Sequence, residues 1–191
     1  FSLIDTILDL FPDKVFEDPH LKWLDPGTGH GYFMMALYKR LYYGIIEKIP
    51  NPQARSKHII ENMLYMCEIN EIHKSHLESL FGVKANIVYG DFLEYNQDFQ
   101  FDCIIGNPPY SISSSNKSKW IIGLLNDYKK DLNEKNVQPL SDDYIKFFKA
   151  SEYYIKKSNY GILSMITNNS YMDGIIHRQM RKHLLEYDDV M

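Results

Sequence analysis

The sequence predicts an α/β domain with a mostly parallel central sheet and helices on both faces. Short apolar runs alternate with segments of helical periodicity along the whole chain. A glycine-rich turn directly follows the first apolar run, and polar residues follow the next three runs. Strands that alternate with helices form parallel sheets, because each crossover helix returns the chain to the same end of the sheet. We therefore expect one domain over residues 1–191.

The elements of the first half follow from apolar spacing and from residues that stop helices. Apolar residues at helical spacing between Leu3 and Phe11 predict the first helix, and Pro12 ends it. Gly82 is a natural stop for the helix that precedes it. The expected elements are a helix at 3–11, a strand at 20–24, helix 32–43, a short helix after the loop at 50–52, strand 64–68, helix 70–81 and strand 85–89.

The second half begins with a polar connection and ends with two further helices. The segment Ser111–Lys119 is rich in serine and lysine, and we expect it to be a mobile loop. A long helix is indicated by apolar residues that recur at helical spacing between Tyr144 and Lys157. The expected elements are strand 101–105, a short helix near 120–130, helix 144–157, strand 160–167 and helix 174–185.

Composition places the chain among ordinary globular domains, with 45% hydrophobic and 24% charged residues. A net charge of −4 argues against a protein that coats nucleic acid, although it leaves room for a local basic groove. Cys67 and Cys103 lie in apolar runs and are predicted to be buried and reduced. The cysteines and histidines show no metal-ligand spacing. Without a signal peptide or a membrane-length apolar segment, the expected location is the cytoplasm.

The segment 106–110 (Gly-Asn-Pro-Pro-Tyr) is the first candidate for chemistry. Both prolines lack a backbone N–H and have a fixed φ, and each pushes the preceding residue towards an extended conformation. The carbonyls of Asn107 and Pro108 are therefore expected to remain acceptors, next to the Asn107 side-chain oxygen. Tyr110 offers a face for stacking, so the segment suits a planar exocyclic amine. The alternative is a proline-rich turn after a buried strand.

The segment 25–31 (Asp-Pro-Gly-Thr-Gly-His-Gly) is the second candidate. Glycines at positions 27, 29 and 31 remove side chains that would keep a ligand away from the backbone. The glycine spacing differs from the dinucleotide fingerprint, which argues against an oxidoreductase, and a P-loop lysine is absent. Asp25 would favour a ligand that carries an ammonium or a sulfonium. The alternative is a tight structural turn.

Acidic residues follow the next two predicted strands. Glu68 ends one strand, where an acidic residue typically accepts the two hydroxyls of a ribose. Asp91 follows the other strand and could accept a hydrogen bond from an adenine amino group, with Phe92 against the ring. Either acid alone could simply cap a helix. Polar residues at four successive strand ends instead indicate the edge where an open α/β sheet binds ligands.

In this order, the motifs resemble those of adenine-N6 DNA methyltransferases that use S-adenosylmethionine and carry the cofactor motif first. More narrowly, the chain is similar to the methyltransferase domains of large single-chain restriction-modification enzymes. The resemblance spans nearly the whole chain and includes segment 144–147 (Tyr-Ile-Lys-Phe) and the closing stretch 168–185. In segment 25–31, Gly-Thr and His stand where the family often has Ala-Cys and Ser.

The resemblance implies a Rossmann-like methyltransferase fold and methyl transfer from S-adenosylmethionine to N6 of adenine, with no metal. The partner it implies is double-stranded DNA whose target adenine is flipped out and stacked on Tyr110. The implied catalytic residues are Asn107, Pro108, Pro109 and Tyr110. The implied cofactor-binding residues are Asp25, Pro26, Gly27, Thr28, Gly29, Glu68, Ile69, Asp91, Phe92 and Phe147.

The family also has parts that this sequence does not contain. A Thr-Pro segment usually precedes its first helix, and the last strands of the sheet and a target-recognition domain are expected beyond position 191. We therefore expect the chain to be a fragment of a longer protein. In that protein the domain is expected to be continuous with, or bound to, target-recognition and restriction domains. No membrane partner is expected.

Other functions remain open at this point. The same tetrapeptide serves enzymes that methylate glutamine in protein release factors or amino groups of RNA bases, because a carboxamide is also a planar amine. A non-catalytic subunit could keep the fold in order to bind nucleic acid or a partner, but intact Asn107 and Tyr110 argue against it. Pro26 after Asp25 and the stretch 168–185 favour DNA adenine.

Two polar segments are weaker candidates for contact with DNA. A basic turn near the end of the chain is predicted to be a solvated helix face rather than a phosphate contact. It comprises Arg178, Arg181, Lys182 and His183. The loop Ser111–Lys119, with Trp120, follows the tetrapeptide closely enough to cover a substrate cleft.

Overall fold

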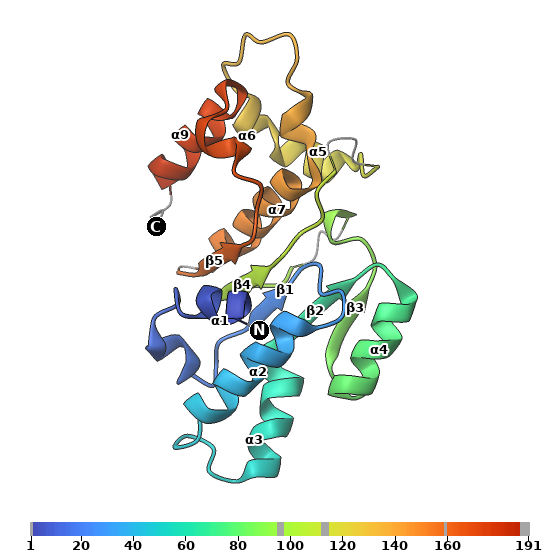
Figure 1. Ribbon diagram of the computed structural model, residues 1–191, viewed down its shortest axis with the longest axis vertical. Coiled ribbons are helices and arrows are strands. Elements are labelled where there is room, and N and C mark those ends of the chain that lie inside the picture. The colour runs from blue at the N-terminus through green and yellow to red at the C-terminus, as the bar shows by residue number, and fades with distance from the viewer. Residues whose placement is uncertain (1, 95–97, 112–114, 159, 188–191) are drawn as a thin grey trace.

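The computed structural model describes residues 2–94, 98–111, 115–158 and 160–187, and a parallel sheet forms its centre (Figure 1). The sheet has five strands in the order β3-β2-β1-β4-β5, and every neighbouring pair is parallel. The strands are β1 (Trp23–Asp25), β2 (Leu64–Glu68), β3 (Asn86–Tyr89), β4 (Cys103–Gly106) and β5 (Ile162–Met165). The predicted α/β class with a parallel sheet is confirmed.

Helices lie between the strands and on both sides of the sheet in sequence. They are α1 (Ser2–Leu8), α2 (Tyr32–Gly44), α3 (Pro52–His58), α4 (Glu71–Phe81), α5 (Lys119–Leu124), α6 (Asn126–Lys129), α7 (Asp143–Lys157), α8 (Ser170–Asp173) and α9 (Arg178–Tyr187). Short turns are η1 (Asp13–Phe16), η2 (Ile59–Met63), η3 (Phe92–Glu94), η4 (Gln138–Ser141) and η5 (Ile175–His177). Asn70 caps α4 by accepting from the Ile72 N–H at 2.9 Å, and Gly82 ends that helix at φ 88°.

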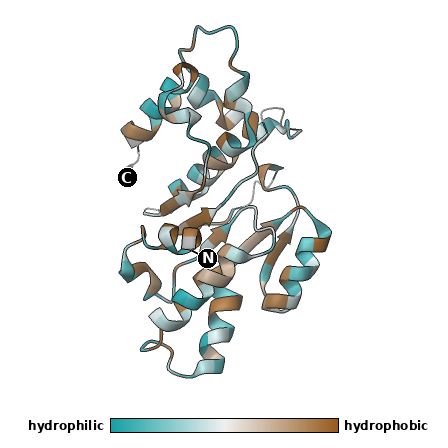
Figure 2. Cartoon of the chain, viewed as in Figure 1, coloured by the Kyte–Doolittle hydropathy of each residue, from teal (hydrophilic) through white to brown (hydrophobic). Residues whose placement is uncertain are grey.

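Side chains that alternate along each strand divide between two hydrophobic cores. Trp23 and Cys103 pack with α1, α2 and α4 in one core, whereas Leu24 and Ile104 pack with η3, α5 and α7 in the other. Because successive side chains of a strand point to opposite faces, the two cores cover opposite faces of the sheet. Figure 2 shows the apolar strands at the centre and more polar helix surfaces outside. Helices therefore cover both faces, as predicted.

Several elements are shorter than the sequence predicts. The first strand begins at Trp23; just before it, the Lys22 N–H donates to the Asp102 carboxylate at 2.8 Å, and the Lys22 carbonyl accepts from the Cys103 N–H at 3.1 Å. The expected helix near 120–130 is divided into α5 and α6. The expected helix at 174–185 begins only at Arg178, because Gly174 has an extended ψ of 131° that ends α8.

The basic turn on α9 faces its own protein more than solvent, so the predicted solvated face is wrong for most of it. Arg178 pairs with Glu134, and Arg181 Nη1 donates to the Gly174 carbonyl at 2.8 Å. His183 contacts a buried glutamate on α7. Only Lys182 in this set has an exposed side chain, 3.7 Å from Glu186. These contacts fasten α9 to the rest of the chain.

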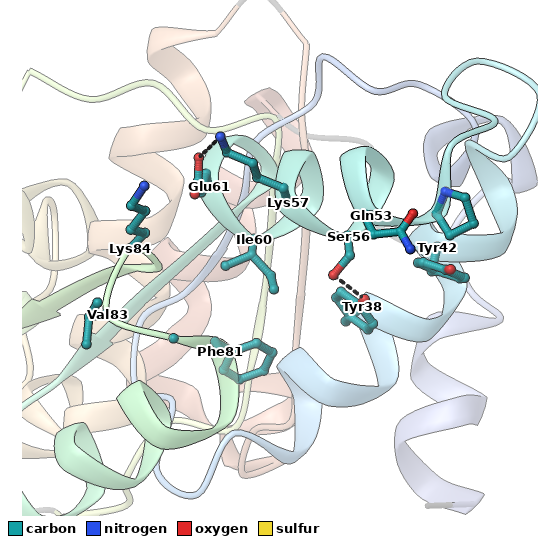
Figure 3. A pocket seen from close by; sticks show the side chains of 12 residues that line it. Tyr38, Tyr42, Gln53, Ser56, Lys57, Ile60, Glu61, Phe81, Val83 and Lys84 are labelled. Carbon is teal, nitrogen blue, oxygen red and sulfur yellow. Dashed lines mark hydrogen bonds and ion pairs between the residues drawn. The ribbon is translucent and has the colours of Figure 1, made fainter.

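A surface groove of about 730 Å³ lies between α2, α3 and the chain that follows α4 (Figure 3). Tyr38 and Tyr42 on the second half of α2 form one wall, and Val83 and Lys84 before β3 form another. The groove therefore lies towards the amino ends of the strands and contains none of the predicted site residues. Among the described helices, none has both the length and the apolar composition that crossing a bilayer requires.

Candidate active site

The four predicted site segments meet at the carboxyl edge of the sheet. They follow β1, β2, β3 and β4, which lie side by side in the sheet. Backbone hydrogen bonds join neighbouring segments directly: the Thr28 N–H donates to the Cys67 carbonyl at 3.1 Å, and the Gly90 N–H donates to the Glu68 carbonyl at 3.0 Å. Residues that are distant in sequence thus form one continuous surface, as expected for ligand binding in an open α/β sheet.

The glycine turn between β1 and α2 requires glycine for two different reasons. Gly31 has φ +82°, and a Cβ there would lie 2.7 Å from the Leu77 side chain. Gly29 has φ +57°, a region that L side chains rarely adopt, and a Cβ there would meet nothing within 4 Å. The turn is therefore packed against α4 at Gly31 and open at Gly29, where a ligand can approach the backbone.

Glu68 is held against this turn by two backbone donors. Its Oε2 accepts from the Gly29 N–H at 2.6 Å, and its Oε1 accepts from the Asn70 N–H at 2.7 Å. His73 Nδ1 lies 3.7 Å from Oε1. The next residue, Ile69, is 63% exposed and offers an apolar surface at the same edge. The Glu68 carboxylate is thus fixed in orientation while each oxygen keeps a further lone pair.

Asp25 is a buried carboxylate between the glycine turn and the end of β4. Burial, with a smaller contribution from the charge of nearby Glu68, raises its pKa to about 7 in spite of the hydrogen bond from the Gly27 N–H. A Cβ on Gly106 would lie 2.9 Å from Asp25 Oδ1, so glycine lets the two strand ends approach. Among the described residues, no cationic side chain forms an ion pair with Asp25. A buried acid without an internal counter-charge is typical of functional sites.

Asp91 and two aromatic rings form the next part of the edge. Asp91 Oδ1 accepts from the Leu93 N–H at 2.9 Å, and Oδ2 accepts from Asn116 Nδ2 at 2.7 Å. The Phe92 and Phe147 ring centroids are 5.5 Å apart. Phe147 also extends from α7 to the glycine turn, since a Cβ on Gly27 would lie 3.5 Å from its ring. The structure thereby groups the predicted aromatic residues with Asp91.

The tetrapeptide after β4 presents its amide and its ring towards the surface. Asn107 and Pro109 are exposed, Pro108 is buried and Tyr110 is 48% exposed. The Tyr110 hydroxyl lies 3.1 Å from Asn107 Oδ1 and 3.0 Å from the Ile166 carbonyl oxygen. Its single hydrogen is shared between these two acceptors. The predicted acceptor Asn107 Oδ1 therefore has a protein donor beside it in this conformation.

The segment after the tetrapeptide is partly described, with residues 112–114 outside the described part. The Ser111 N–H donates to Asp142 Oδ1 at 3.0 Å, and Ser118 Oγ donates to the Leu93 carbonyl at 2.8 Å. Trp120 packs against Tyr153 of α7 with ring centroids 5.5 Å apart, so it contributes to the core instead of covering a cleft. The expectation that this segment covers the substrate applies at most to its remaining residues.

Asn116 and Lys146 are site residues that the sequence did not reveal. Asn116 lies within a serine- and lysine-rich segment, and Lys146 lies on a helix whose spacing only indicates burial of the neighbouring apolar residues. Both are nearly inaccessible to solvent, at 7% and 2% exposed. For Asn116, the only available signal was a polar residue shortly after the tetrapeptide, and most residues of that loop share this property.

The residues at this edge suit a nucleoside cofactor that carries a positive charge. Three carboxylates, two aromatic rings and the open side of the glycine turn offer acceptors, stacking surfaces and space. Within the described residues, no cluster of histidine, cysteine and acidic side chains could hold a metal ion. Both cysteines are buried thiols.

The parallel sheet with helices on both faces has the fold of a putative class I S-adenosylmethionine-dependent methyltransferase from Listeria monocytogenes, with a TM-score of 0.57 and 12% identity over 97% of this chain and 50% of that one. Residues 37–190 match the family of Eco57I restriction-modification methylases, and the chain belongs to that family. The family assignment confirms the resemblance to restriction-modification methyltransferases that the strand-end motifs predict.

Individual proteins agree with this assignment. The chain is 24% identical to the Type II methyltransferase M.BstVI of Geobacillus stearothermophilus, over 96% of the chain and 35% of that protein. It is 41% identical over 59 residues, 30% of the chain and 14% of the relative, to an uncharacterized adenine-specific methylase of Mycoplasma pneumoniae. The DNA-bound Type ISP restriction-modification enzyme LlaBIII has the same fold, with a TM-score of 0.73 and 24% identity over 90% of this chain and 14% of that one. The chain thus spans about a third, or less, of these proteins.

Proposed function

We propose that this chain is the methyltransferase unit of a restriction-modification enzyme and transfers a methyl group from S-adenosylmethionine to N6 of adenine in DNA. The observation that carries this proposal is the position of Asn107 and Tyr110 at the end of β4, beside the glycine turn, Glu68 and Asp91. An acceptor for a planar amine and a nucleoside site then share one edge of the sheet. The adenine-specific name of the Mycoplasma pneumoniae relative supports the same choice.

The cofactor would be held by the acidic and aromatic residues of the first three strand ends. Glu68 would accept hydrogen bonds from the ribose hydroxyls through its remaining lone pairs, and Asp91 would accept one from the adenine amino group, with Phe92 against the ring and Phe147 near it. The turn residues Pro26, Gly27, Thr28 and Gly29 and the exposed Ile69 would shape the pocket. Asp25 would gain the counter-charge that it lacks internally, which would lower its raised pKa. S-adenosylmethionine, when bound, supplies an electrophilic methyl group.

Asn107 and Pro108 would activate the target amine. The lone pair of adenine N6 is delocalised into the ring, which makes the nitrogen a poor nucleophile. Hydrogen bonds from both N6 hydrogens, to Asn107 Oδ1 and the Pro108 carbonyl, favour a more tetrahedral nitrogen. These bonds strengthen as positive charge develops on N6, so they stabilise the transition state more than the ground state. The methylated nitrogen is acidic and loses its proton afterwards, so a strong general base is unnecessary.

Tyr110 would receive the base after it leaves the duplex. Extrusion of a base costs a few kcal/mol, and stacking on an aromatic ring offsets part of that cost. Pro109 keeps the backbone before Tyr110 extended, because its ring restricts the conformation of its neighbours. The Tyr110 hydroxyl, now 3.1 Å from Asn107 Oδ1, would have to yield that acceptor to the incoming amine. Selection of the target sequence is proposed to reside in other parts of the parent protein.

The test is to identify the methylated atom. The full-length parent protein is incubated with methyl-labelled S-adenosylmethionine and unmethylated double-stranded DNA, and the DNA is digested to nucleosides. We expect the label in N6-methyladenine and none in DNA whose adenines are already methylated. Label on cytosine would contradict the proposal, as would label on protein glutamine or RNA with none on DNA.

A further inference from the structure

Asn116 connects three segments around the proposed cofactor pocket. Its Nδ2 donates to Asp91 Oδ2 at 2.7 Å, and its Oδ1 accepts from the Ser118 N–H at 3.0 Å. The Lys146 ammonium donates to its backbone carbonyl. Because a backbone N–H such as that of Ser118 can only donate, the atom of the Asn116 amide that faces it must be Oδ1, which leaves the NH2 group towards Asp91.

Lys146, on α7, supports the contact between Asn116 and Asp91. Its side chain is 2% exposed, and burial lowers its pKa, whereas the charges of Asp143 and Asp91 raise it. The ammonium therefore lies in the field of the Asp91 carboxylate while it bonds the Asn116 carbonyl. The next residue on α7, Phe147, contacts the glycine turn and Phe92. One helical turn of α7 thus supports both the polar and the aromatic side of the pocket.

We infer that Asn116 is a positioning residue: it fixes the plane of the Asp91 carboxylate and so makes the pocket selective for a cofactor base with an exocyclic amino group. This inference rests on the proposed function. Asp91 Oδ1 accepts a hydrogen bond from the Leu93 N–H, and Oδ2 accepts one from Asn116. The carboxylate therefore cannot rotate without breaking one of these hydrogen bonds. The second lone pair of Oδ2 remains for the ligand.

The fixed plane discriminates by repulsion as well as by attraction. A 6-amino purine presents a hydrogen-bond donor to Asp91 Oδ2. A 6-oxo purine presents an oxygen instead, and two oxygens repel each other when the carboxylate cannot rotate to avoid the contact. Specificity commonly combines both effects. Without Asn116, the carboxylate could rotate or take up water, and the penalty against the 6-oxo base would fall. The opposite interpretation is that the Asn116 amide occupies the place of the cofactor amine and blocks it, in which case removing the amide would tighten binding.

The experiment compares two cofactor products that differ only at that group. Dissociation constants of S-adenosylhomocysteine and S-inosylhomocysteine are measured by calorimetry for the wild type, Asn116→Ala and Asn116→Leu. The leucine variant keeps the volume of the side chain, and Ser115→Ala, at an exposed neighbour, is the matched control. Loss of a hydrogen bond to a charged group should reduce the preference for the adenosyl compound roughly tenfold in both Asn116 variants. The control should keep the wild-type ratio.

The outcomes separate this inference from the proposed function. An unchanged ratio in folded Asn116→Ala and Asn116→Leu would overturn the positioning role while leaving the cofactor assignment intact. Tighter binding of S-adenosylhomocysteine by both variants would overturn it in favour of a blocking role. If the wild type bound neither compound, the cofactor assignment would be wrong; if it bound both equally, the cofactor assignment would stand and the selectivity assigned to Asp91 and Asn116 would be wrong.

Discussion

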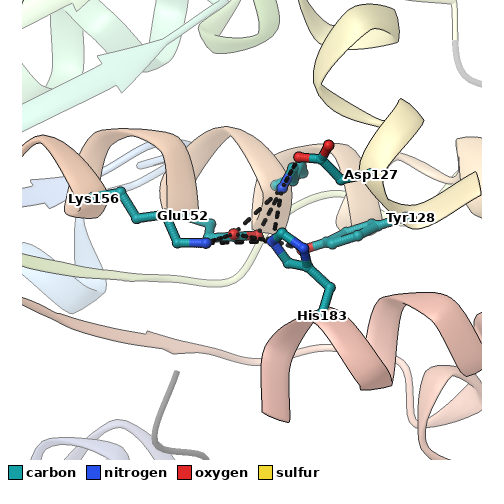
Figure 4. Close-up of polar contacts among 6 residues, drawn as sticks. Asp127, Tyr128, Glu152, Lys156 and His183 are labelled. Carbon is teal, nitrogen blue, oxygen red and sulfur yellow. Dashed lines mark hydrogen bonds and ion pairs between the residues drawn. The ribbon is translucent and has the colours of Figure 1, made fainter. Parts of the chain in front are cut away.

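Asp25 and Glu152 are both buried carboxylates, but their surroundings give them opposite properties. They are 1% and 4% exposed. Burial raises the pKa of Asp25 to about 7. Burial acts on Glu152 in the same direction, but the charge of Lys149 and the surrounding hydrogen bonds bring its pKa down to about 2. The partners of Glu152 are Tyr128, Lys149, Lys156 and His183 (Figure 4).

The difference is the one expected between a structural acid and, as we propose for Asp25, an acid arranged for a ligand. Glu152 receives all its compensation from the protein, and its network joins α6, α7 and α9. Asp25 receives one backbone hydrogen bond, 3.2 Å from the Gly27 N–H, and faces Glu68 instead of a cation. Both acids have perturbed pKa values, so perturbation alone does not identify a functional group; the missing counter-charge does.

The largest expected effect is on the stability of the protein when Glu152 is removed. Removing one partner of a buried ion network leaves uncompensated charge, so Glu152→Ala should lower the free energy of unfolding by about 3–5 kcal/mol. Chemical denaturation followed by circular dichroism measures this change. Lys156→Ala is the matched control, since its side chain is 39% exposed and its loss should cost far less. A Glu152→Ala loss no larger than that of the control would show that the network contributes little.

The two acids should also respond to pH in opposite directions. The native state holds a proton on Asp25 more tightly than the unfolded chain does, so this residue makes stability fall as pH rises from about 4 to about 7. Asp25→Asn should remove up to about 4 kcal/mol of that decline. Glu152 stabilises above its unfolded pKa, and its contribution is lost as pH falls from about 4.5 towards 2. Parallel pH profiles of unfolding for wild type and Asp25→Asn would refute the assignment for Asp25.

The smallest expected effect concerns the hydroxyl of Tyr110. Tyr110→Phe keeps the ring and removes the donor that lies 3.1 Å from Asn107 Oδ1. One neutral hydrogen bond contributes about 1 kcal/mol, so the affinity for DNA with a mispaired target adenine should rise about fivefold at most. Methyl transfer should stay within tenfold of wild type. A hundredfold loss of turnover would instead assign the hydroxyl a direct part in catalysis.

The parts of the fold and site that are predictable are those encoded locally. Strand β2 has its predicted bounds because an apolar run ends at an acidic residue, and the segments after β1, β3 and β4 are recognisable because each combines glycine or proline with a polar residue. The unpredicted contacts depend on tertiary structure. Asn116 meets Asp91 from 25 positions away, and the Ile166 carbonyl meets Tyr110 from 56 positions away. Backbone carbonyls and amides of loops carry no periodic signal, so only the folded sheet brings them together.

The central claim is that Asn107 activates an amine in a site whose cofactor half works independently. The most direct measurement is single-turnover methyl transfer to DNA by Asn107→Ala in the parent protein, together with the dissociation constant of S-adenosylmethionine. Losing a donor or acceptor that acts mainly in the transition state typically costs 10²–10³ in rate, so turnover should fall by roughly that factor or more. Cofactor affinity should stay within about threefold of wild type, a change of only about 0.7 kcal/mol, because Asn107 is not among the residues proposed to hold the cofactor. Near-normal turnover by Asn107→Ala would contradict the account.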